Sequence, residues 1–185
     1  SWNDKETDAI QFRCERSQHF DTNKLRIMIK MFFLCACVAG LVAHMSIPDK
    51  YIVYIKKHGH KAQMLHVTHG VPTSIQLAQA IYESGAGSSD LAKEANNHFG
   101  IRCGDGWSGK EHHTESGCWR KYDRVGESYL DHANYLAKYY PKALRKPWQH
   151  WVKYCKGYGG PGYWKKVGQI IQKYELYKYD FDYIR

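Results

Sequence analysis

The sequence has 185 residues, with 27 Lys+Arg against 18 Asp+Glu and a formal net charge of +9. Hydrophobic residues make up 43% and charged residues 24%, which argues against a wholly disordered chain and is enough for a core without metal or disulfide support. The basic excess suits an acidic partner, and the 15 Tyr and 6 Trp supply rings that stack on bases or sugars. Nucleic acid, an anionic membrane surface and an acidic polymer such as a bacterial cell wall all stay open.

The most apolar segment, Met31–Ala43, has the layout of a secretory signal peptide. It follows Arg26 and Lys30, it ends in small residues, and it is shorter than the roughly 20 residues of a membrane-spanning helix. One alternative is a buried helix of the fold. A second is a lipoprotein, because Leu34–Cys37 resembles a lipobox.

This segment divides the chain into three parts. We expect an upstream or disordered tail at 1–27, a signal peptide at 28–44 and one domain at 45–185. The protein is then exported to the periplasm, the cell envelope or the outside of the cell, with no stable membrane span.

Three cysteines remain after the signal peptide. Cys103 and Cys118 close a short loop of glycine and polar residues, and in an oxidising compartment we expect them to form a disulfide. Such a loop stabilises the fold by about 3 kcal/mol in the chain-entropy model. We expect Cys155 to be buried and unpaired.

The alternative for the histidine-rich parts of the chain is a metal site. Eleven His are present, and the clusters are His58-x-His60, His66-x-x-His69 and His112-His113-x-Glu115. Zinc needs about four N, S or O ligands around one point. Because these clusters lack a recognised zinc spacing, we expect no metal and no cofactor.

The first half of the domain reads as helical. An irregular helix is expected over Ile47–Thr68, and Gly70-Val71-Pro72 breaks it. Thr73 followed by Gln76 indicates a capping box, and the next helix should run to about Ser84, where Gly85 ends it. The apolar positions of the first helix are Tyr51, Ile52, Ile55, Met64, Leu65 and Val67.

A short helix over Asp90–Ala95, capped by Ser88 or Ser89, leads into a different pattern. Glycines punctuate Phe99–Tyr122, which predicts a small antiparallel sheet with tight turns.

Helical periodicity then resumes to the end of the domain. Asp123 can cap a helix that Pro141 closes, and Pro147 suits the first turn of the next helix. A glycine-rich loop precedes a last helix that carries Trp164 and Tyr174. The expected fold class is a mostly helical α+β domain with one inserted β-lobe.

Glu83 is the carboxylate that stands out. It ends a largely apolar helix just before a glycine-rich turn, where the negative end of the helix dipole disfavours a carboxylate. Apolar and small neighbours act in the same direction, and a raised pKa is what a general acid needs at neutral pH. The alternative is an exposed polar residue that finishes a helix.

Three stretches carry a resemblance to a known family. They are VPTSIQLAQAIYESGAGSSDLAKEANNHFGIRC, CWRKYDRVGESYLDHANYL and GY…YWKKVGQIIQKYELYKYD, which together span about Lys50 to Asp180. The most specific strings are ESGxGxSxLA and NNHFGI. The chain resembles the bacterial endo-β-N-acetylglucosaminidases of glycoside hydrolase family 73, found in flagellar peptidoglycan hydrolases and autolysins.

The resemblance implies a lysozyme-like fold, with a helical lobe and a β-lobe beside a sugar groove. It implies cleavage of the β-1,4 bond between N-acetylglucosamine and N-acetylmuramic acid in peptidoglycan. The family's catalytic acid falls on Glu83. The second acidic residue of the family comes from the β-lobe, and we favour Glu115, with Asp105 next and Glu111 and Asp123 as further candidates.

The family also has a GY-A-T-[DN]-P-x-Y loop whose first Tyr lies at the active site. Tyr158 and Tyr163 match its two tyrosines, and Gly159-Gly160 replaces the Ala-Thr pair, which predicts a more flexible loop. We expect Tyr158 to be catalytic and Tyr163 to bind substrate.

Three further residues are candidates for shaping the sugar groove. Asn97 either lines it or caps a helix. Of Trp107 and Trp119 in the β-lobe, we expect one to stack on sugar, with Trp107 as our choice, and the other to lie in the core.

The expected partner is therefore the glycan strand of peptidoglycan, bound by a monomer. No nucleic-acid motif is present, so we expect no nucleic acid. The alternatives are a muramidase or lytic transglycosylase on the same scaffold, and a non-catalytic cell-wall binding module.

Overall fold

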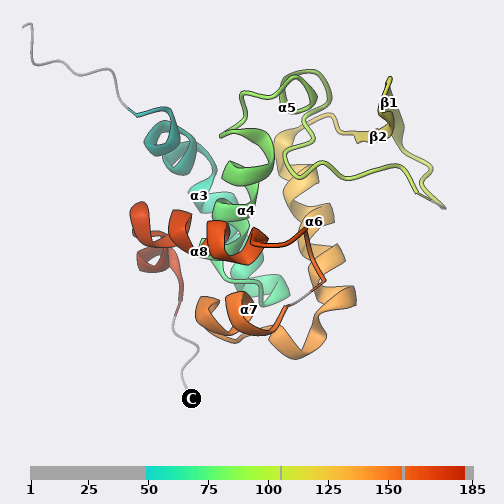
Figure 1. Ribbon diagram of the computed structural model, residues 1–185. Helices are drawn as coiled ribbons and strands as arrows, with labels where there is room; N and C mark the ends of the chain where they lie inside the picture. Colours follow the sequence, from blue (N-terminus) through green and yellow to red (C-terminus); the bar gives the residue numbers. More distant parts are fainter. Residues whose placement is uncertain (1–48, 105, 156, 182–185) are drawn as a thin grey trace, which may run out of the picture. The chain divides into compact units, whose positions relative to one another are not determined.

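The computed structural model describes residues 49–104, 106–155 and 157–181 of the chain (Figure 1). The predicted tail and signal peptide, and the candidate acid Asp105, lie outside the described residues and stay predictions. No helix in the described part is both long and apolar enough to cross a membrane.

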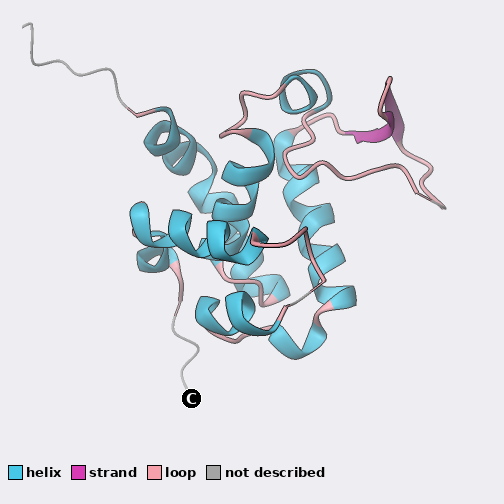
Figure 2. Ribbon diagram, viewed as in Figure 1, coloured by secondary structure: helices cyan, strands magenta, loops and turns pink. Residues whose placement is uncertain are grey.

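Helices dominate the described domain, and one two-stranded antiparallel sheet accompanies them (Figure 2). This confirms the predicted mostly helical α+β class. The helices are α3 (Lys50–His69), α4 (Thr73–Ser84), α5 (Asp90–Ala95), α6 (Val125–Tyr139), α7 (Trp148–Tyr154) and α8 (Tyr163–Lys173). The strands are β1 (Lys110–Thr114) and β2 (Gly117–Lys121), and the short 3-10 helices are η1 (Pro141–Ala143) and η2 (Leu176–Tyr179).

Helix α4 is the central element of the core. Every residue from Thr73 to Ile81 is buried, and α3, α8 and η2 pack around it. A helix that is apolar on all sides needs neighbours all around it. Segments far apart in the chain supply these neighbours. Tyr82 and Glu83 are the two exposed residues of the helix.

The predicted capping box at the start of α4 is wrong. Pro72 occupies the N-cap position without a side-chain cap, and the Gln76 amide donates to the carbonyl oxygens of Ala62 and Val71 instead. The cap comes from the far end of the domain. The Asp180 carboxylate accepts hydrogen bonds from the Ser74 N–H at 2.8 Å and from the Ser74 hydroxyl at 2.6 Å.

Helix α3 exists as predicted, and two of its six apolar positions, Ile55 and Leu65, are buried. Ile52, Met64 and Val67 are instead 37%, 50% and 59% exposed. Aromatic and small residues and two histidines complete the buried face. Its members are Tyr54, Ile55, His58, Gly59, Ala62, Leu65 and His66.

A chain of buried hydrogen bonds joins α3, α6 and the segment after α5. The Tyr129 hydroxyl donates to the Tyr54 hydroxyl at 3.0 Å, and the Tyr54 hydroxyl lies 2.6 Å from Nδ1 of His98. Burial raises the pKa of both tyrosines and lowers the pKa of His98 to about 4, so all three side chains are uncharged near neutral pH. The His58 ring stacks on the Tyr129 ring at 5.8 Å and lies tilted against the Tyr54 ring at 4.4 Å.

The β-hairpin pairs in register from Lys110 opposite Lys121 to Thr114 opposite Gly117, and it extends by one bridge between Arg102 and Trp119. The small antiparallel sheet is thus confirmed. Its two strands occupy only the second half of the predicted region Phe99–Tyr122.

The predicted disulfide between Cys103 and Cys118 is present, with their Cα atoms 5.6 Å apart. It links the chain that enters the lobe to β2. Cys155 is free and buried, as predicted.

The predicted helix cap at Asp123 is wrong. Arg124 occupies the N-cap position of α6 and makes no side-chain cap. The Asp123 carboxylate binds Lys110 Nζ at 2.5 Å, and the Glu127 carboxylate accepts from the Asp123 N–H at 3.1 Å.

The buried histidines predict a loss of stability in mild acid. Burial lowers the pKa of His58, His66 and His98 to about 4 and that of His132 to about 3, whereas a His in an unfolded chain titrates near 6.5. Between those pH values the unfolded state binds more protons. The free energy of unfolding is therefore fully present above about pH 6.5 and falls as the pH drops toward about 4. Each tenfold difference in proton affinity between the folded and unfolded states corresponds to roughly 1.4 kcal/mol for one histidine.

Thermal unfolding measured from pH 7.5 to 4.5 checks this expectation. His58→Gln should flatten the fall, whereas His60→Gln, at an exposed position of the same helix, should keep the wild-type slope. Equal slopes for both variants would contradict the assignment.

Candidate active site

Glu83 lies one residue before the end of α4, at an abrupt turn. Gly85 adopts a left-handed conformation with φ 58°, and the Ala86 N–H donates to the Ile81 carbonyl at 3.1 Å. Partial burial raises the pKa of the Glu83 carboxyl above its usual range, and a hydrogen bond from the Tyr163 side chain opposes part of that rise. The expectation of a raised pKa thus has a physical cause in the structure.

The turn after Glu83 is held against the buried hydrogen-bond chain. The Ser84 hydroxyl donates to the Ala80 carbonyl at 2.6 Å and accepts from the Gly87 N–H at 2.8 Å. A Cβ on Gly87, whose φ is +74°, would lie 3.1 Å from the His98 ring and 3.2 Å from the Tyr54 ring. The close approach needs glycine at this position.

Tyr163 connects Glu83 to a second residue of α4. The Gln79 amide nitrogen donates to the Tyr163 hydroxyl at 3.0 Å, and the same hydroxyl donates to the Glu83 carboxylate. Because Gln79 and Glu83 are four residues apart, they share one face of the helix. Gln79 was not predicted, although its spacing from Glu83 on an apolar helix was visible in the sequence.

Tyr158 lies beside Tyr163, with ring centroids 5.2 Å apart. Burial and then the Glu83 carboxylate raise the pKa of Tyr158, so this hydroxyl is a neutral donor close to Glu83. The Tyr158 hydroxyl also lies 3.1 Å from Nε2 of His132. The structure therefore brings Glu83, Tyr158 and Tyr163 together.

His132 of α6 also belongs to this cluster. It is 1% exposed, stacks on Phe99 at 3.9 Å, and its Nδ1 has no hydrogen-bond partner in the described residues. A buried N–H without a partner is rarer than a buried acceptor without one. We infer the tautomer with the proton on Nε2, which donates to Tyr158 and leaves the phenol proton free to point elsewhere.

The loop before α8 passes close over the Tyr163 ring. Gly159 has φ +72°, and a Cβ there would lie 2.3 Å from Tyr163 Cγ, whereas Gly160 has no atom within 4 Å. Gly159 thus lets the backbone approach the ring, and the greater flexibility expected of the loop stays a prediction. A cavity of about 370 Å³ opens on this loop, lined mainly by residues 157–165 with Val152, and it does not include Glu83.

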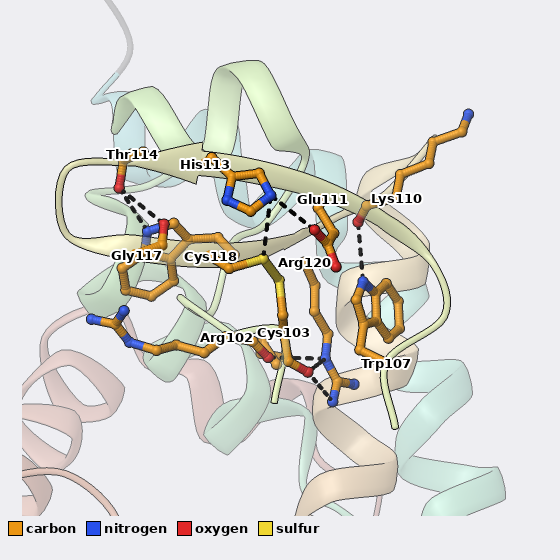
Figure 3. Close-up of a disulfide and its surroundings, with 12 residues drawn as sticks. Arg102, Cys103, Trp107, Lys110, Glu111, His113, Thr114, Gly117, Cys118 and Arg120 are labelled. Atoms are coloured by element: carbon orange, nitrogen blue, oxygen red, sulfur yellow. Dashed lines mark hydrogen bonds and ion pairs between the residues drawn. A yellow bond between two sulfur atoms is a disulfide. The ribbon is translucent and has the colours of Figure 1, made fainter. Parts of the chain in front are cut away.

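Three candidates for the second carboxylate lie on or near the hairpin, in different surroundings, and Figure 3 shows one of them, Glu111. Glu115 occupies the exposed turn between β1 and β2. Glu111 lies on β1, and its carboxylate is 2.8 Å from Nε2 of His113. The same nitrogen lies 3.9 Å from the Cys118 sulfur. The Asp123 carboxylate forms a salt bridge with Lys110. Of these three, Glu115 is the carboxylate left unengaged within the described residues.

Asn97 is engaged inside the protein. Its amide nitrogen donates to the carbonyl oxygens of Ile101 and Arg120, its oxygen accepts from the Ile101 N–H, and the residue is 1% exposed. Asn97 therefore fixes the entry to the β-lobe, and we do not retain it as a sugar ligand.

Trp107 and Trp119 each lie half-buried under an arginine. The Arg120 guanidinium is 4.4 Å from the Trp107 ring, and the Arg102 guanidinium is 4.1 Å from the Trp119 ring. Arg120 also pairs with Asp131 of α6 at 2.8 Å, which ties the hairpin to the helical part. Neither tryptophan belongs to the main core.

The three histidine clusters do not form a metal site in the described residues. The one group of possible ligands that lies close together there is Cys103, Glu111 and Cys118. Its two sulfurs are bonded to each other in the disulfide.

The loop geometry predicts opposite tolerance at two adjacent glycines. Gly159→Ala should lower activity at least several-fold and reduce stability by about 1–3 kcal/mol, because the Cβ overlaps the Tyr163 ring and the backbone has positive φ. Gly160→Ala, in open space, should be within about 1 kcal/mol of wild type. Hydrolysis assays with thermal melts of both variants check this, and equal behaviour of the pair would refute the close approach.

The chain was compared with known proteins. The family model described as mannosyl-glycoprotein endo-beta-N-acetylglucosaminidase matches residues 59–176. The exo-glucosaminidase LytG of Bacillus subtilis (strain 168) is 30% identical over an alignment of 195 residues, covering 85% of this chain and 68% of that protein.

Solved structures agree in fold. The catalytic domain of the autolysin Auto from Listeria monocytogenes is 26% identical with a TM-score of 0.63, covering 78% of this chain and 96% of that one. The peptidoglycan hydrolase from Sphingomonas sp. A1 is 26% identical with a TM-score of 0.57, covering 69% and 91%. The lysozyme-like fold is confirmed, and the chain belongs to the glucosaminidases of glycoside hydrolase family 73, a family of peptidoglycan hydrolases.

Proposed function

We propose that this domain hydrolyses the β-1,4 bond between N-acetylglucosamine and N-acetylmuramic acid, with Glu83 as the general acid. One observation carries the assignment: an exposed carboxyl at the end of a buried helix has a raised pKa and a tyrosine hydroxyl holding it in place. Such a carboxyl is accessible to a sugar, and its raised pKa favours the protonated form that proton donation to a leaving oxygen requires.

In the proposed reaction, Glu83 gives its proton to the glycosidic oxygen as the bond to the anomeric carbon breaks. Tyr163 orients the carboxyl, and Tyr158 offers a neutral hydroxyl to the same region. The carboxylate left behind takes a proton back from the attacking water or from a later water. Each hydrogen bond to the charged form of Glu83 helps it to release the proton.

The second group of the reaction is a separate proposal. We favour Glu115, because it is an exposed carboxylate on the hairpin turn with no competing ion pair in the described residues. It would act as a nucleophile or as a base for water, depending on its separation from Glu83 once substrate is bound. A substrate-assisted route through the acetamido group would leave Glu115→Gln with most of its activity.

The proposed substrate and place of action go together. Peptidoglycan and its attached polymers are anionic, and the formal charge of +9 favours their approach. Action on the wall requires an exported protein, in agreement with the predicted signal peptide. We propose a monomer acting on glycan strands, without nucleic acid.

Glu83→Gln tests the catalytic assignment. The amide keeps the size of the side chain and can still accept from Tyr163, but it has no acidic proton to deliver. We expect hydrolysis of purified peptidoglycan to fall by about 10²–10⁴-fold while wall binding and the melting temperature stay near wild type. Wild-type hydrolysis by a folded Glu83→Gln protein would remove Glu83 from the mechanism.

Mass analysis of the wild-type products tests the bond. Reducing-end N-acetylglucosamine supports the proposal, reducing-end N-acetylmuramic acid identifies a muramidase, and 1,6-anhydromuramic acid identifies a lytic transglycosylase. Early fragment lengths separate internal cleavage from release of units at a strand end.

The pH profile tests the role of Tyr163. The raised pKa of Glu83 means that its acid form is lost as the pH rises through that pKa, which sets the alkaline limb of kcat/KM. Tyr163→Phe removes a donor to the carboxylate, so the pKa of Glu83 should rise further and the alkaline limb should move to higher pH, with a lower maximum.

Tyr82→Phe is the matched control for this measurement. Tyr82 contacts the Tyr163 ring at 5.3 Å, but its hydroxyl accepts from Lys166 rather than bonding Glu83. The control should leave the limb in place. A limb that moves to lower pH in Tyr163→Phe would contradict the proposed hydrogen bond.

A further inference from the structure

We propose that Tyr135 and Tyr139, on the exposed face of α6, form a sugar-stacking platform that binds the glycan strand next to the cleavage site. The inference rests on the proposed function and extends it, because it assigns a binding subsite to two residues outside the Glu83 cluster.

The platform continues the cluster around Glu83 without a break. Tyr158, whose pKa responds to the Glu83 carboxylate, lies edge-on to the Tyr135 ring at 5.9 Å. The Tyr135 ring in turn lies 4.5 Å from the Tyr139 ring. The rings therefore form a row that leads from the general acid onto the outer surface of α6.

The two outer rings are open to solvent, unlike those nearer Glu83. Tyr135 is 42% exposed and Tyr139 is 55% exposed, whereas Tyr163 is 5% exposed. Residues four apart lie on the same face of a helix, one turn from each other. The two exposed aromatic side chains thus form an apolar surface beside the proposed catalytic site. The apolar face of a flat ligand can cover such a surface.

A glycan strand is the occupant that this surface fits. The less polar faces of its sugar rings can lie on the tyrosines, and its hydroxyl and acetamido groups can bond the phenol oxygens. Lys138 lies over the Tyr139 ring at 5.1 Å and adds a cation beside it. That cation suits the carboxylates of peptidoglycan, whereas a purely apolar partner would gain nothing from it.

The domain supplies closely matched controls. Tyr154 is 58% exposed and carries Lys153 over its ring at 5.0 Å, much like Tyr139 with Lys138, but its ring lies against His150 of α7. Tyr177 is 42% exposed, as Tyr135 is, and its hydroxyl bonds Glu175. Neither control belongs to the row of rings from Glu83.

The test compares Tyr135→Ala/Tyr139→Ala with Tyr154→Ala/Tyr177→Ala on peptide-free glycan strands of graded length. We expect the platform variant to raise KM for long strands about tenfold, which equals about 1.4 kcal/mol of lost binding, with kcat within about twofold of wild type. For the shortest cleaved strands the two double variants should match. The wild-type preference for long strands should disappear in the platform variant alone.

A second measurement keeps this inference separate from the proposed function. Affinity for long strands is measured in the Glu83→Gln background, where binding is read without hydrolysis. A loss of affinity specific to the platform variant supports the inference even if the wild type cuts a different bond. Equal affinity and equal KM in the platform and control variants would overturn it while leaving Glu83 as the acid.

Discussion

The buried hydrogen bonds from Tyr129 to Tyr54 and from Tyr54 to His98 are the constraint on which the site depends. They join α6, α3 and the segment that enters the β-lobe at one point in the core. A buried polar group without a partner is costly, so each of the three side chains fixes the position of the next. The turn after Glu83 packs against this point through Gly87. The orientation of the end of α4 that carries Glu83 is thus set by side chains buried in the core.

A second consequence of the packing is the state of Glu83. Partial burial raises the pKa of this carboxyl, and among the described residues no cation is a cause that draws it down. The Tyr163 hydroxyl limits that rise and is itself held by Gln79. Glu83 also acts on its neighbours. After burial, its carboxylate is the next cause that raises the pKa of Tyr158, which keeps that hydroxyl protonated. The site can therefore cycle the charge of one group while its neighbours stay neutral.

Elements with a local cause could be predicted from the sequence. Glycine and proline mark the ends of α4 and α6, and the spacing of Cys103 and Cys118 indicated their disulfide. Interactions that depend on distant segments could not. The cap of α4 comes from Asp180, 106 residues from Ser74, so the local Thr73–Gln76 pattern misled. Ile55 and Leu65 of the buried face of α3 were among the expected apolar positions, but His58 and His66 were missed, because a hydropathy pattern counts histidine as polar.

The same division holds for the site. Glu83 could be proposed from the sequence because its helix and its glycines are adjacent in the chain, and the family pattern added Tyr158 and Tyr163 as candidates. Gln79 and His132 act through partners 84 and 26 residues away, and only the fold reveals those pairs. A carboxylate on a hairpin makes no local pattern at all, which is why Glu115 remains a proposal.

The loop before α8 shows how a departure from a family pattern can be a packing requirement. Where the family has Ala-Thr, this chain has Gly159-Gly160, and in its present path a Cβ at 159 would overlap the Tyr163 ring. The two positions are not equivalent, because Gly160 faces open space. Gly159 thus allows the loop to lie close to the Tyr163 ring, whereas the space around Gly160 would admit a side chain. Since Tyr163 bonds Glu83, the backbone of this loop and the carboxyl of the proposed general acid are linked through a single tyrosine residue.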